Sequence, residues 1–223
     1  MHTLPRPAVA TPSRRRVRMP SAWAAGLAAA ILVAGRCLAE SPPPAAATEA
    51  APLESIFNGR DLAGWRPPEG SFWRVESGVL VGENDAAKAG SMLFTERSYR
   101  DVVFEADVRF TGEIDSGIML RRPEIQVQLG VSRSLKRDMT CSFYTGRYPE
   151  EGRAGRAGDL LRPGDWNHIR VEARGDTFTV WLNGEQVSRY TDPTYAAAGP
   201  IGLQIHAGLA MKVEFRAIRA AAL

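Results

Sequence analysis

Alternating apolar and polar residues dominate the chain from Leu53 onward. In residues 104–110, FEADVRF, the apolar side chains fall on one face and the charged side chains on the other. This period of two is typical of a half-buried antiparallel strand. Residues 168–173 and 212–216 repeat the pattern, and no stretch beyond Leu53 offers three turns of amphipathic helix. The pattern therefore predicts an all-β domain.

Turn residues separate these strands at short intervals. Asn183-Gly184 follows the apolar run 178–182, and this pair is the strongest short signal for a β-hairpin. Strands separated by turn signals every 8 to 12 residues or so, without an internal repeat, predict an antiparallel β-sandwich or jelly roll and not a propeller. Residues 146–164, rich in Gly and Arg, are expected to form a long loop.

The first 39 residues have a different composition. Arg14-Arg15-Arg16 precede an uncharged run, Ala22–Gly35, whose 14 residues are fewer than a membrane span needs; a span takes about 20. A basic segment, a short apolar segment and small residues near position 39 are typical of an export signal. We therefore expect residues 1–39 to be a signal peptide, by the general or the twin-arginine route, and the mature protein to be periplasmic or secreted with no membrane span.

Two further features belong to this part of the chain. Cys37 raises the alternative of a lipoprotein, although Arg36 stands where a small residue should precede a lipidated Cys. Residues 40–52 are a Pro/Ala-rich linker, which leaves 53–223 as the folded domain. Removal of Cys37 would leave Cys141 without a disulfide partner, so the core must hold this domain by itself.

The charge of the folded domain argues against a nucleic-acid partner. The full chain carries a net charge of +3, but residues 1–39 hold six arginines and no acid, so the remainder carries −3. A nucleic-acid-binding domain needs a basic footprint, which a mildly acidic domain does not have. No nucleophile elbow, phosphate loop, dinucleotide fingerprint or pair of metal-spaced histidines is present either.

Two strand-like segments carry uncharged polar side chains where the other strands carry charges. In Glu124–Gln128 the first, third and fifth residues share a face, and Gln204 shares a face with His206. Arg121 lies just before the first segment. An alternating polar face commonly just faces water. Amides and a histidine, however, suit hydrogen bonds with a hydroxyl-rich ligand, so the segments predict a sugar-binding groove.

Six segments resemble, in order, motifs of the 3-keto-disaccharide hydrolase domain family. The first is residues 53–65, LESIFNGRDLAGW, and the others are residues 73–80, 115–121, 124–128, 166–184 and 199–206. The resemblance covers residues 53 to 220. It implies a concanavalin A-like jelly roll that acts on glycosides whose sugar is oxidised at carbon 3.

The chemistry implied by this resemblance is elimination followed by hydration. A ketone at carbon 3 acidifies the proton on carbon 2, so a base removes that proton and the glycosidic oxygen leaves. Water then adds back, which gives net hydrolysis. This route needs a base and a group that polarises the ketone, whereas ordinary glycosidases use two carboxyl groups.

The resemblance also implies roles for particular residues. The candidates for the catalytic base are Glu124 and His206. The candidates for holding the substrate's keto, hydroxyl or leaving oxygens are Arg121, Gln126, Tyr144 and Gln204. No organic cofactor is expected. A divalent metal is left open, because Leu129 stands where relatives carry an Asp.

The resemblance also implies partners for this protein. The expected substrate is a 3-keto-glycoside, and a separate sugar 3-dehydrogenase would have to supply it. The alternative is a non-catalytic, lectin-like carbohydrate-binding module on the same sandwich, because one fold hosts many functions.

Overall fold

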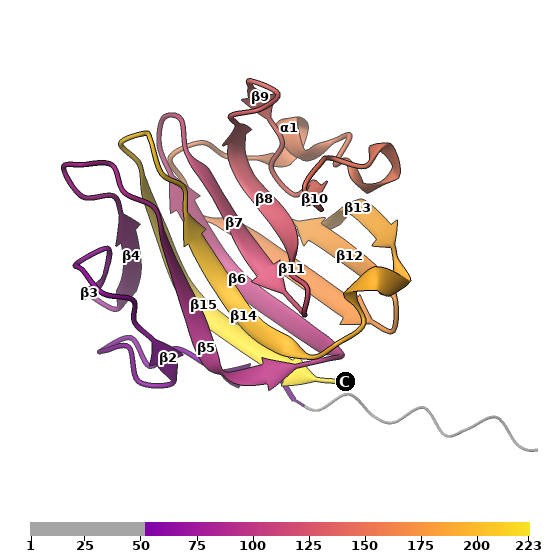
Figure 1. The fold of residues 1–223 in the computed structure, drawn as a ribbon, viewed down its shortest axis with the longest axis horizontal. Coiled ribbons are helices and arrows are strands. Elements are labelled where there is room, and N and C mark those ends of the chain that lie inside the picture. The colour runs from indigo at the N-terminus through magenta and orange to yellow at the C-terminus, as the bar shows by residue number, and fades with distance from the viewer. Residues whose placement is uncertain (1–51) are drawn as a thin grey trace, which may run out of the picture. The chain divides into compact units, whose positions relative to one another are not determined.

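The computed structural model describes residues 52–223, which form two antiparallel sheets packed face to face (Figure 1). We call the sheet nearer the viewer in Figure 1 the front sheet and the other the back sheet. The front sheet consists of β2 (Trp65–Arg66), β5 (Ser91–Tyr99), β7 (Asp115–Leu120), β8 (Ile125–Ser132), β9 (Arg137–Asp138), β10 (Phe143–Tyr144) and β14 (Gly199–Ile205). The back sheet consists of β1 (Glu54–Ser55), β3 (Trp73–Glu76), β4 (Val79–Glu83), β6 (Val102–Phe110), β11 (Asn167–Arg174), β12 (Thr177–Leu182), β13 (Glu185–Thr191) and β15 (Lys212–Ala222). The helical turns are η1 (Glu150–Gly152), α1 (Ala157–Leu160) and η2 (Pro193–Tyr195).

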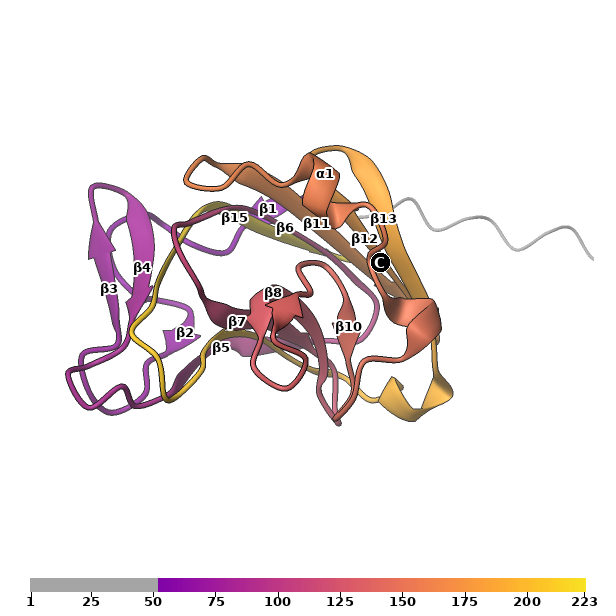
Figure 2. The same cartoon turned by 90° about the horizontal axis from the view of Figure 1, so that it is seen from above.

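Strands distant in the sequence are neighbours in both sheets. The front sheet has the order β10-β8-β7-β14-β5-β2, with β9 beside β8. The back sheet has the order β13-β12-β11-β6-β15-β4-β3, with β1 beside β15. Seen from above, the two sheets form separate layers (Figure 2). The predicted antiparallel β-sandwich is confirmed.

The core lies between the layers and follows from the alternation in the sequence. On the front sheet Leu203, Ile118 and Val127 are neighbours across β14, β7 and β8, and all three are fully buried. Phe104 and Val108 of β6 are fully buried as well. Each such side chain contributes roughly 1.5–3 kcal/mol by leaving water. Because these residues point inward, their sequence neighbours on the front sheet point outward.

The segment predicted as a long loop, 146–164, is mostly irregular and contains only the short turns η1 and α1 among its described elements. Cys141 is a buried free thiol. No helix within residues 52–223 is long and apolar enough to cross a membrane. The expected signal peptide, Cys37 and nearly all of the expected linker lie outside the described residues.

Candidate functional site

A row of outward-facing positions crosses the middle of the front sheet. Gln204 of β14 lies opposite Gly117 of β7, and Gly117 lies opposite Gln128 of β8. In the neighbouring row Met119 of β7 lies opposite Gln126 of β8. The register therefore brings together three glutamines that lie up to 78 residues apart in the sequence.

The amide groups of these glutamines form a directed chain of hydrogen bonds. Gln126 Nε2 donates to Gln128 Oε1 at 2.8 Å and to Gln204 Oε1 at 3.2 Å. Gln128 Nε2 donates to Asp115 Oδ1 at 2.8 Å, and the backbone N–H of Arg133 donates to Asp115 Oδ2 at 3.3 Å. Each amide is thus fixed in one orientation. The chain leaves Gln126 Oε1 and Gln204 Nε2, within residues 52–223, without a protein partner, as one acceptor and one donor available to a ligand.

A glycine makes room for this chain. A Cβ atom at Gly117 would lie 2.4 Å from Gln126 Nε2 and 2.7 Å from Gln126 Cδ. The Gln126 side chain therefore lies across the Gly117 backbone and reaches Gln204 on the strand beyond. Any larger residue at position 117 would displace Gln126.

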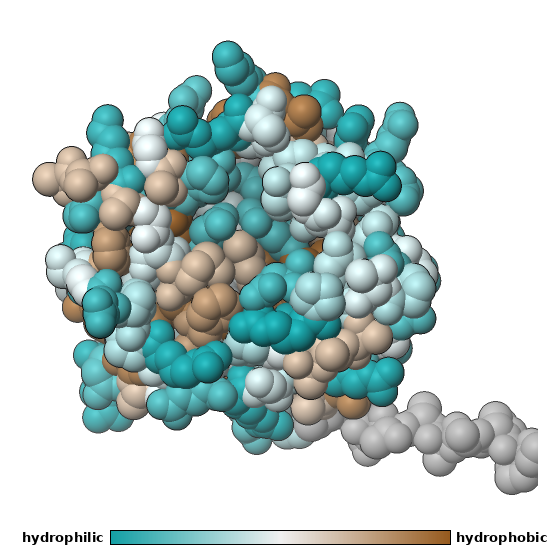
Figure 3. Space-filling view, in the orientation of Figure 1, coloured by the Kyte–Doolittle hydropathy of each residue, from teal (hydrophilic) through white to brown (hydrophobic). Residues whose placement is uncertain are grey.

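These side chains form the floor of a pocket of about 220 Å³, whose walls include Tyr144, Tyr148 and His206. The two tyrosine rings lie 4.9 Å apart between centroids. Burial of the Tyr148 phenol raises its pKa to about 12, so the group stays protonated and remains a hydrogen-bond donor at neutral pH. Figure 3 looks onto this face of the molecule, where polar and apolar surfaces lie side by side over the middle of the sheet.

His206 follows β14 directly and is anchored by its backbone. Its N–H donates to the Asp115 carbonyl at 3.1 Å, and its own carbonyl accepts a hydrogen bond from Asn84 Nδ2 at 3.0 Å. The ring Nδ1 lies 2.8 Å from the Ala207 carbonyl oxygen. Because a carbonyl oxygen only accepts, Nδ1 carries a proton. In the neutral ring Nε2 then holds the lone pair, which is the arrangement a general base needs.

The structure places Arg121 away from this pocket. Its side chain is fully buried, and its terminal nitrogens donate to Asp101 Oδ1 at 3.0 Å and to the carbonyl oxygens of Gly175, Tyr195 and Ala196 at 3.0 to 3.3 Å. The guanidinium is thus engaged in joining both sheets to η2. The role of holding substrate oxygens that we predicted for Arg121 is corrected to a structural one.

Glu124 is also outside the pocket lining. It precedes β8, is exposed, and forms an ion pair with the neighbouring Arg122. The predicted segment 124–128 is therefore split, since Gln126 and Gln128 face the pocket and Glu124 does not line it. Of the six residues predicted for the site, the structure brings together Gln126, Tyr144, Gln204 and His206 at one pocket.

The sequence did not single out Asp115, Gln128 or Tyr148 as site residues, although all three line the pocket. Asp115 lies in one of the family-like segments, and Gln128 lies on the same strand face as Gln126. Both residues could therefore have been recognised from the sequence as candidates for the site. Tyr148 lies in the irregular segment after β10, and no sequence pattern marked it. Asp115 is the one carboxylate among the pocket-lining residues of the described chain.

The described residues offer few side chains that could bind a metal ion. Within residues 52–223, no three His, Cys, Asp or Glu side chains form a group that could hold a metal ion. Leu129, at the position for which the family resemblance implied an Asp, is fully buried in the core. Burial raises the pKa of the Cys141 thiol, so this group is protonated and inaccessible.

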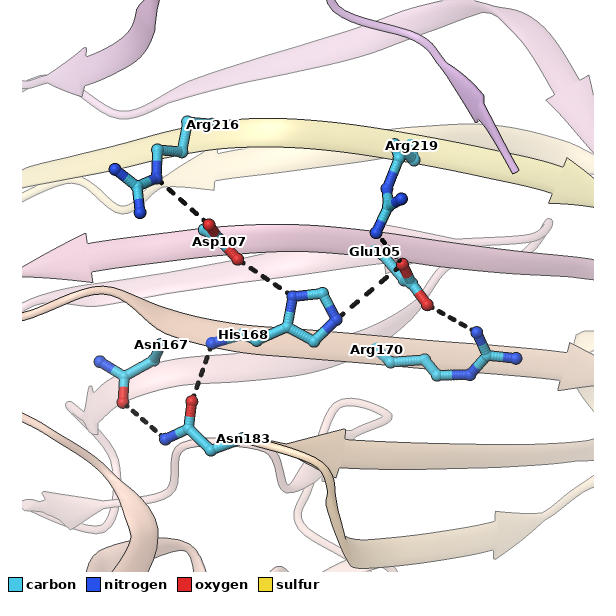
Figure 4. Close-up of polar contacts among 8 residues, drawn as sticks. All are labelled: Glu105, Asp107, Asn167, His168, Arg170, Asn183, Arg216 and Arg219. Atoms are coloured by element: carbon cyan, nitrogen blue, oxygen red, sulfur yellow. Dashed lines mark hydrogen bonds and ion pairs between the residues drawn. The ribbon is translucent and has the colours of Figure 1, made fainter. Parts of the chain in front are cut away.

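The second described histidine, His168, lies on the opposite face of the sandwich (Figure 4). Its Nδ1 is 3.0 Å from Asp107 Oδ1, and Asp107 also accepts a hydrogen bond from Arg216 Nε at 3.2 Å. The neighbouring Glu105 accepts from Arg219 at 2.7 Å and from a further arginine of β11. The charged groups of this face thus pair with one another, and His168 has a structural role.

The fold is a concanavalin A-like β-sandwich, and comparison with known families identifies it as a carbohydrate-related domain. The family model of the 3-keto-alpha-glucoside-1,2-lyase-like domain matches residues 52–221. The chain therefore belongs to this family, the one that the sequence motifs resembled.

Solved structures show the same fold at low sequence identity. A proposed glycosyl hydrolase from Parabacteroides distasonis is 22% identical with a TM-score of 0.59, covering 77% of this chain and 94% of that one. A second from the same organism is 23% identical with a TM-score of 0.57, covering 77% and 84%. The β-glucanase of Bacillus licheniformis is 10% identical with a TM-score of 0.55, covering 79% and 99%. A search of curated proteins finds no match.

Proposed function

We propose that this protein cleaves 3-keto-glycosides by base-assisted elimination, with hydration completing a net hydrolysis. The observation that carries the proposal is the pairing of His206 with the glutamine chain in one pocket. The pocket offers a histidine with its Nε2 lone pair free, and neutral groups that donate to and accept from sugar oxygens. Membership of the 3-keto-alpha-glucoside-1,2-lyase-like family supports the same reaction.

The first step breaks two bonds and forms one double bond. His206 Nε2 removes the proton from carbon 2, and the electron pair of that C–H bond moves toward the carbonyl at carbon 3. The enolate then expels the glycosidic oxygen from carbon 1, which takes up the proton held by His206 and leaves as the alcohol, and the sugar keeps a double bond between carbons 1 and 2. Water then adds across this double bond and supplies a proton to carbon 2 and a hydroxyl group to carbon 1, which leaves His206 neutral again.

The other pocket residues bind and orient the sugar. Gln204 Nε2 donates to a substrate oxygen, and Gln126 Oε1 accepts from a hydroxyl. Tyr144 and Tyr148 supply phenolic donors and a wall for the sugar ring. A donor held at the ketone oxygen stabilises the negative charge that develops there, and loss of one such donor costs about 10²- to 10³-fold in rate in comparable sites.

The pocket chemistry favours elimination over the two-carboxylate mechanism. Within the described chain, Asp115 is the one carboxylate at this pocket, and both of its oxygens already accept hydrogen bonds. An ordinary glycosidase needs two carboxyl groups that flank the scissile bond. Glu124, the other base candidate from the sequence, lies outside the pocket lining, so the base role is given to His206.

The test compares a 3-keto-glucoside with its unoxidised parent. The purified protein should release the alcohol from the keto form alone, and His206→Ala should lower the rate at least about 100-fold, which is the usual contribution of a general base. His168→Ala is the matched control, because it removes a histidine on the opposite face. Wild-type turnover in His206→Ala would overturn the assignment, and a chelator arm measures any dependence on a divalent metal.

A second candidate function is sugar binding without turnover. The adjacent rings of Tyr144 and Tyr148 form an aromatic surface beside exposed His206, an arrangement that also suits a lectin-like module. Binding of the keto-glucoside without alcohol release, measured by calorimetry on the wild-type protein, would favour this alternative.

The proposed reaction also defines its setting. A ketone at carbon 3 is not present in ordinary glycosides, so an oxidoreductase of the sugar 3-dehydrogenase class must act first. The basic and apolar pattern of residues 1–39 supports export, and we propose a periplasmic or secreted location. Detection of the protein in the periplasmic or culture fraction, with the N-terminus cleaved near residue 39, tests this.

A further inference from the structure

A second pocket lies directly beside the first on the same face of the front sheet. It has a volume of about 500 Å³ and shares Gln204 and His206 with the first pocket. In Figure 1, β8 and β10 lie on one side of β14, and β2 and β3 lie on the other side. The first pocket is on the β8 side. The second pocket is on the β5 side, where residues 68–72 between β2 and β3 form its outer wall.

The two pockets differ in chemistry. The floor of the first consists of amides and a carboxylate. The second is lined mainly by apolar groups, which include Pro68, Phe72 and Met92, and its one carboxylate among the described residues, Glu69, is exposed to solvent. Phe72 and Met92 are both half-buried, so each has apolar surface that a ligand could cover. The Ser91 hydroxyl, which also lines the second pocket, already accepts a hydrogen bond from Trp73 Nε1 at 3.0 Å.

The Phe72 ring has a defined place in this wall. A Cβ atom at Gly70 would lie 2.6 Å from Phe72 Cε2, so the ring packs over the glycine backbone. Gly70 has a φ of +94°, a conformation that L side chains rarely adopt. The loop therefore needs glycine at position 70 both for its turn and for the position of the ring.

We propose that the two pockets are two subsites of one groove: the polar pocket takes the oxidised sugar and the Phe72–Met92 pocket takes an apolar aglycone. This inference rests on the proposed function and names its substrate class, namely glycosides of an apolar alcohol such as an aromatic or terpenoid alcohol. The placement is consistent with the chemistry. With the sugar over Gln126 and Gln128 and the aglycone against Phe72, carbons 1 and 2 of the sugar lie at the shared wall, next to His206 Nε2.

The experiment uses two 3-keto-glucosides whose leaving alcohols are similar in acidity, the methyl and the benzyl glucoside. We expect kcat/KM to be about tenfold or more higher for the benzyl compound, because a buried phenyl ring contributes more than 1.4 kcal/mol. Phe72→Ala and Met92→Ser should lower this preference about fivefold or more while leaving turnover of the methyl compound near wild type. Phe94→Ala is the matched control, since Phe94 lies on the same face of β5 but does not line the pocket.

Failure of this inference is distinguishable from failure of the proposed function. Turnover of the methyl compound with an unchanged benzyl preference in Phe72→Ala and Met92→Ser would overturn the aglycone subsite and leave the reaction standing. Absence of turnover for both compounds would refute the reaction. In that case the dissociation constants of the two compounds, measured by calorimetry on the wild type and the same variants, test the subsite. Tighter binding of the benzyl compound to the wild type that is lost in Phe72→Ala would support the subsite. Equal affinities of the wild type for the two compounds would overturn it.

Discussion

Replacement of Gly117 by Ala is the sharpest test of the glutamine chain, because the structure says which side chain must move. The added methyl group would lie 2.4 Å from Gln126 Nε2, and its three nearest atoms all belong to the Gln126 side chain. The backbone has no need to shift, since a flexible side chain gives way first. Gln126 then loses its hydrogen bonds to Gln128 Oε1, to Gln204 Oε1 and to the Ser116 carbonyl.

The magnitude follows from these three bonds. Two of them are long, at 3.2 and 3.3 Å, and the third is 2.8 Å, so we take a total loss of about 2 kcal/mol. Alanine in a strand recovers about 0.5 kcal/mol, because it restricts the unfolded chain. Gly117→Ala should therefore lower the free energy of unfolding by about 1.5 kcal/mol, which shifts the melting temperature by about 3–6 °C.

A double-mutant cycle in urea separates this mechanism from a general strand defect. Gln126→Ala removes the same hydrogen bonds, so adding Gly117→Ala to it should only give the gain of about 0.5 kcal/mol from alanine. The coupling energy should therefore be about 2 kcal/mol. Gly155→Ala is the control, because its methyl group would meet nothing within 4 Å. Equal losses from Gly117→Ala in the wild-type and Gln126→Ala backgrounds would refute the reasoning.

Three further predictions concern buried groups outside the glutamine chain. Arg121→Ala should lower the free energy of unfolding by about 3–5 kcal/mol, since it leaves Asp101 and three backbone carbonyls without their donor. Urea unfolding measures this, and a stable variant with weakened sugar binding would contradict the structural role. Cys141 should react with a thiol reagent at pH 8 only after unfolding, because burial raises its pKa and excludes the reagent; rapid labelling of the native protein would count against the buried position. The pKa of Tyr148 is raised from about 10 in the unfolded chain to about 12 by burial, so its contribution to stability is complete below pH 10 and is lost as the pH rises through 12. Tyr148→Phe should make the stability curve flatter in this window, which urea unfolding at several pH values checks, and an unchanged slope would refute the assignment.

The sequence by itself determined the fold class and four of the residues that line the pocket. Alternation with a period of two tells which residues of a strand point inward, so Ile118, Val127 and Leu203 form the core and Gln126 and Gln204 face outward. This information is local, because it depends on the geometry of a single strand. The family motifs, which the family model confirms, supplied the topology that local patterns do not contain.

Only the tertiary structure decided which polar residues meet. Strand pairing sets Gln204 opposite Gly117 and Gly117 opposite Gln128, and no local pattern contains that register. Two residues that are close in sequence to the pocket strand were misplaced for the same reason. Arg121 follows β7 and turns between the sheets, where its guanidinium meets carbonyls from two other segments. Glu124 precedes β8 and pairs with a neighbour in solvent. The positions of Arg121 and Glu124 depend on contacts that form only in the folded chain, and the alternation along one strand does not predict such contacts.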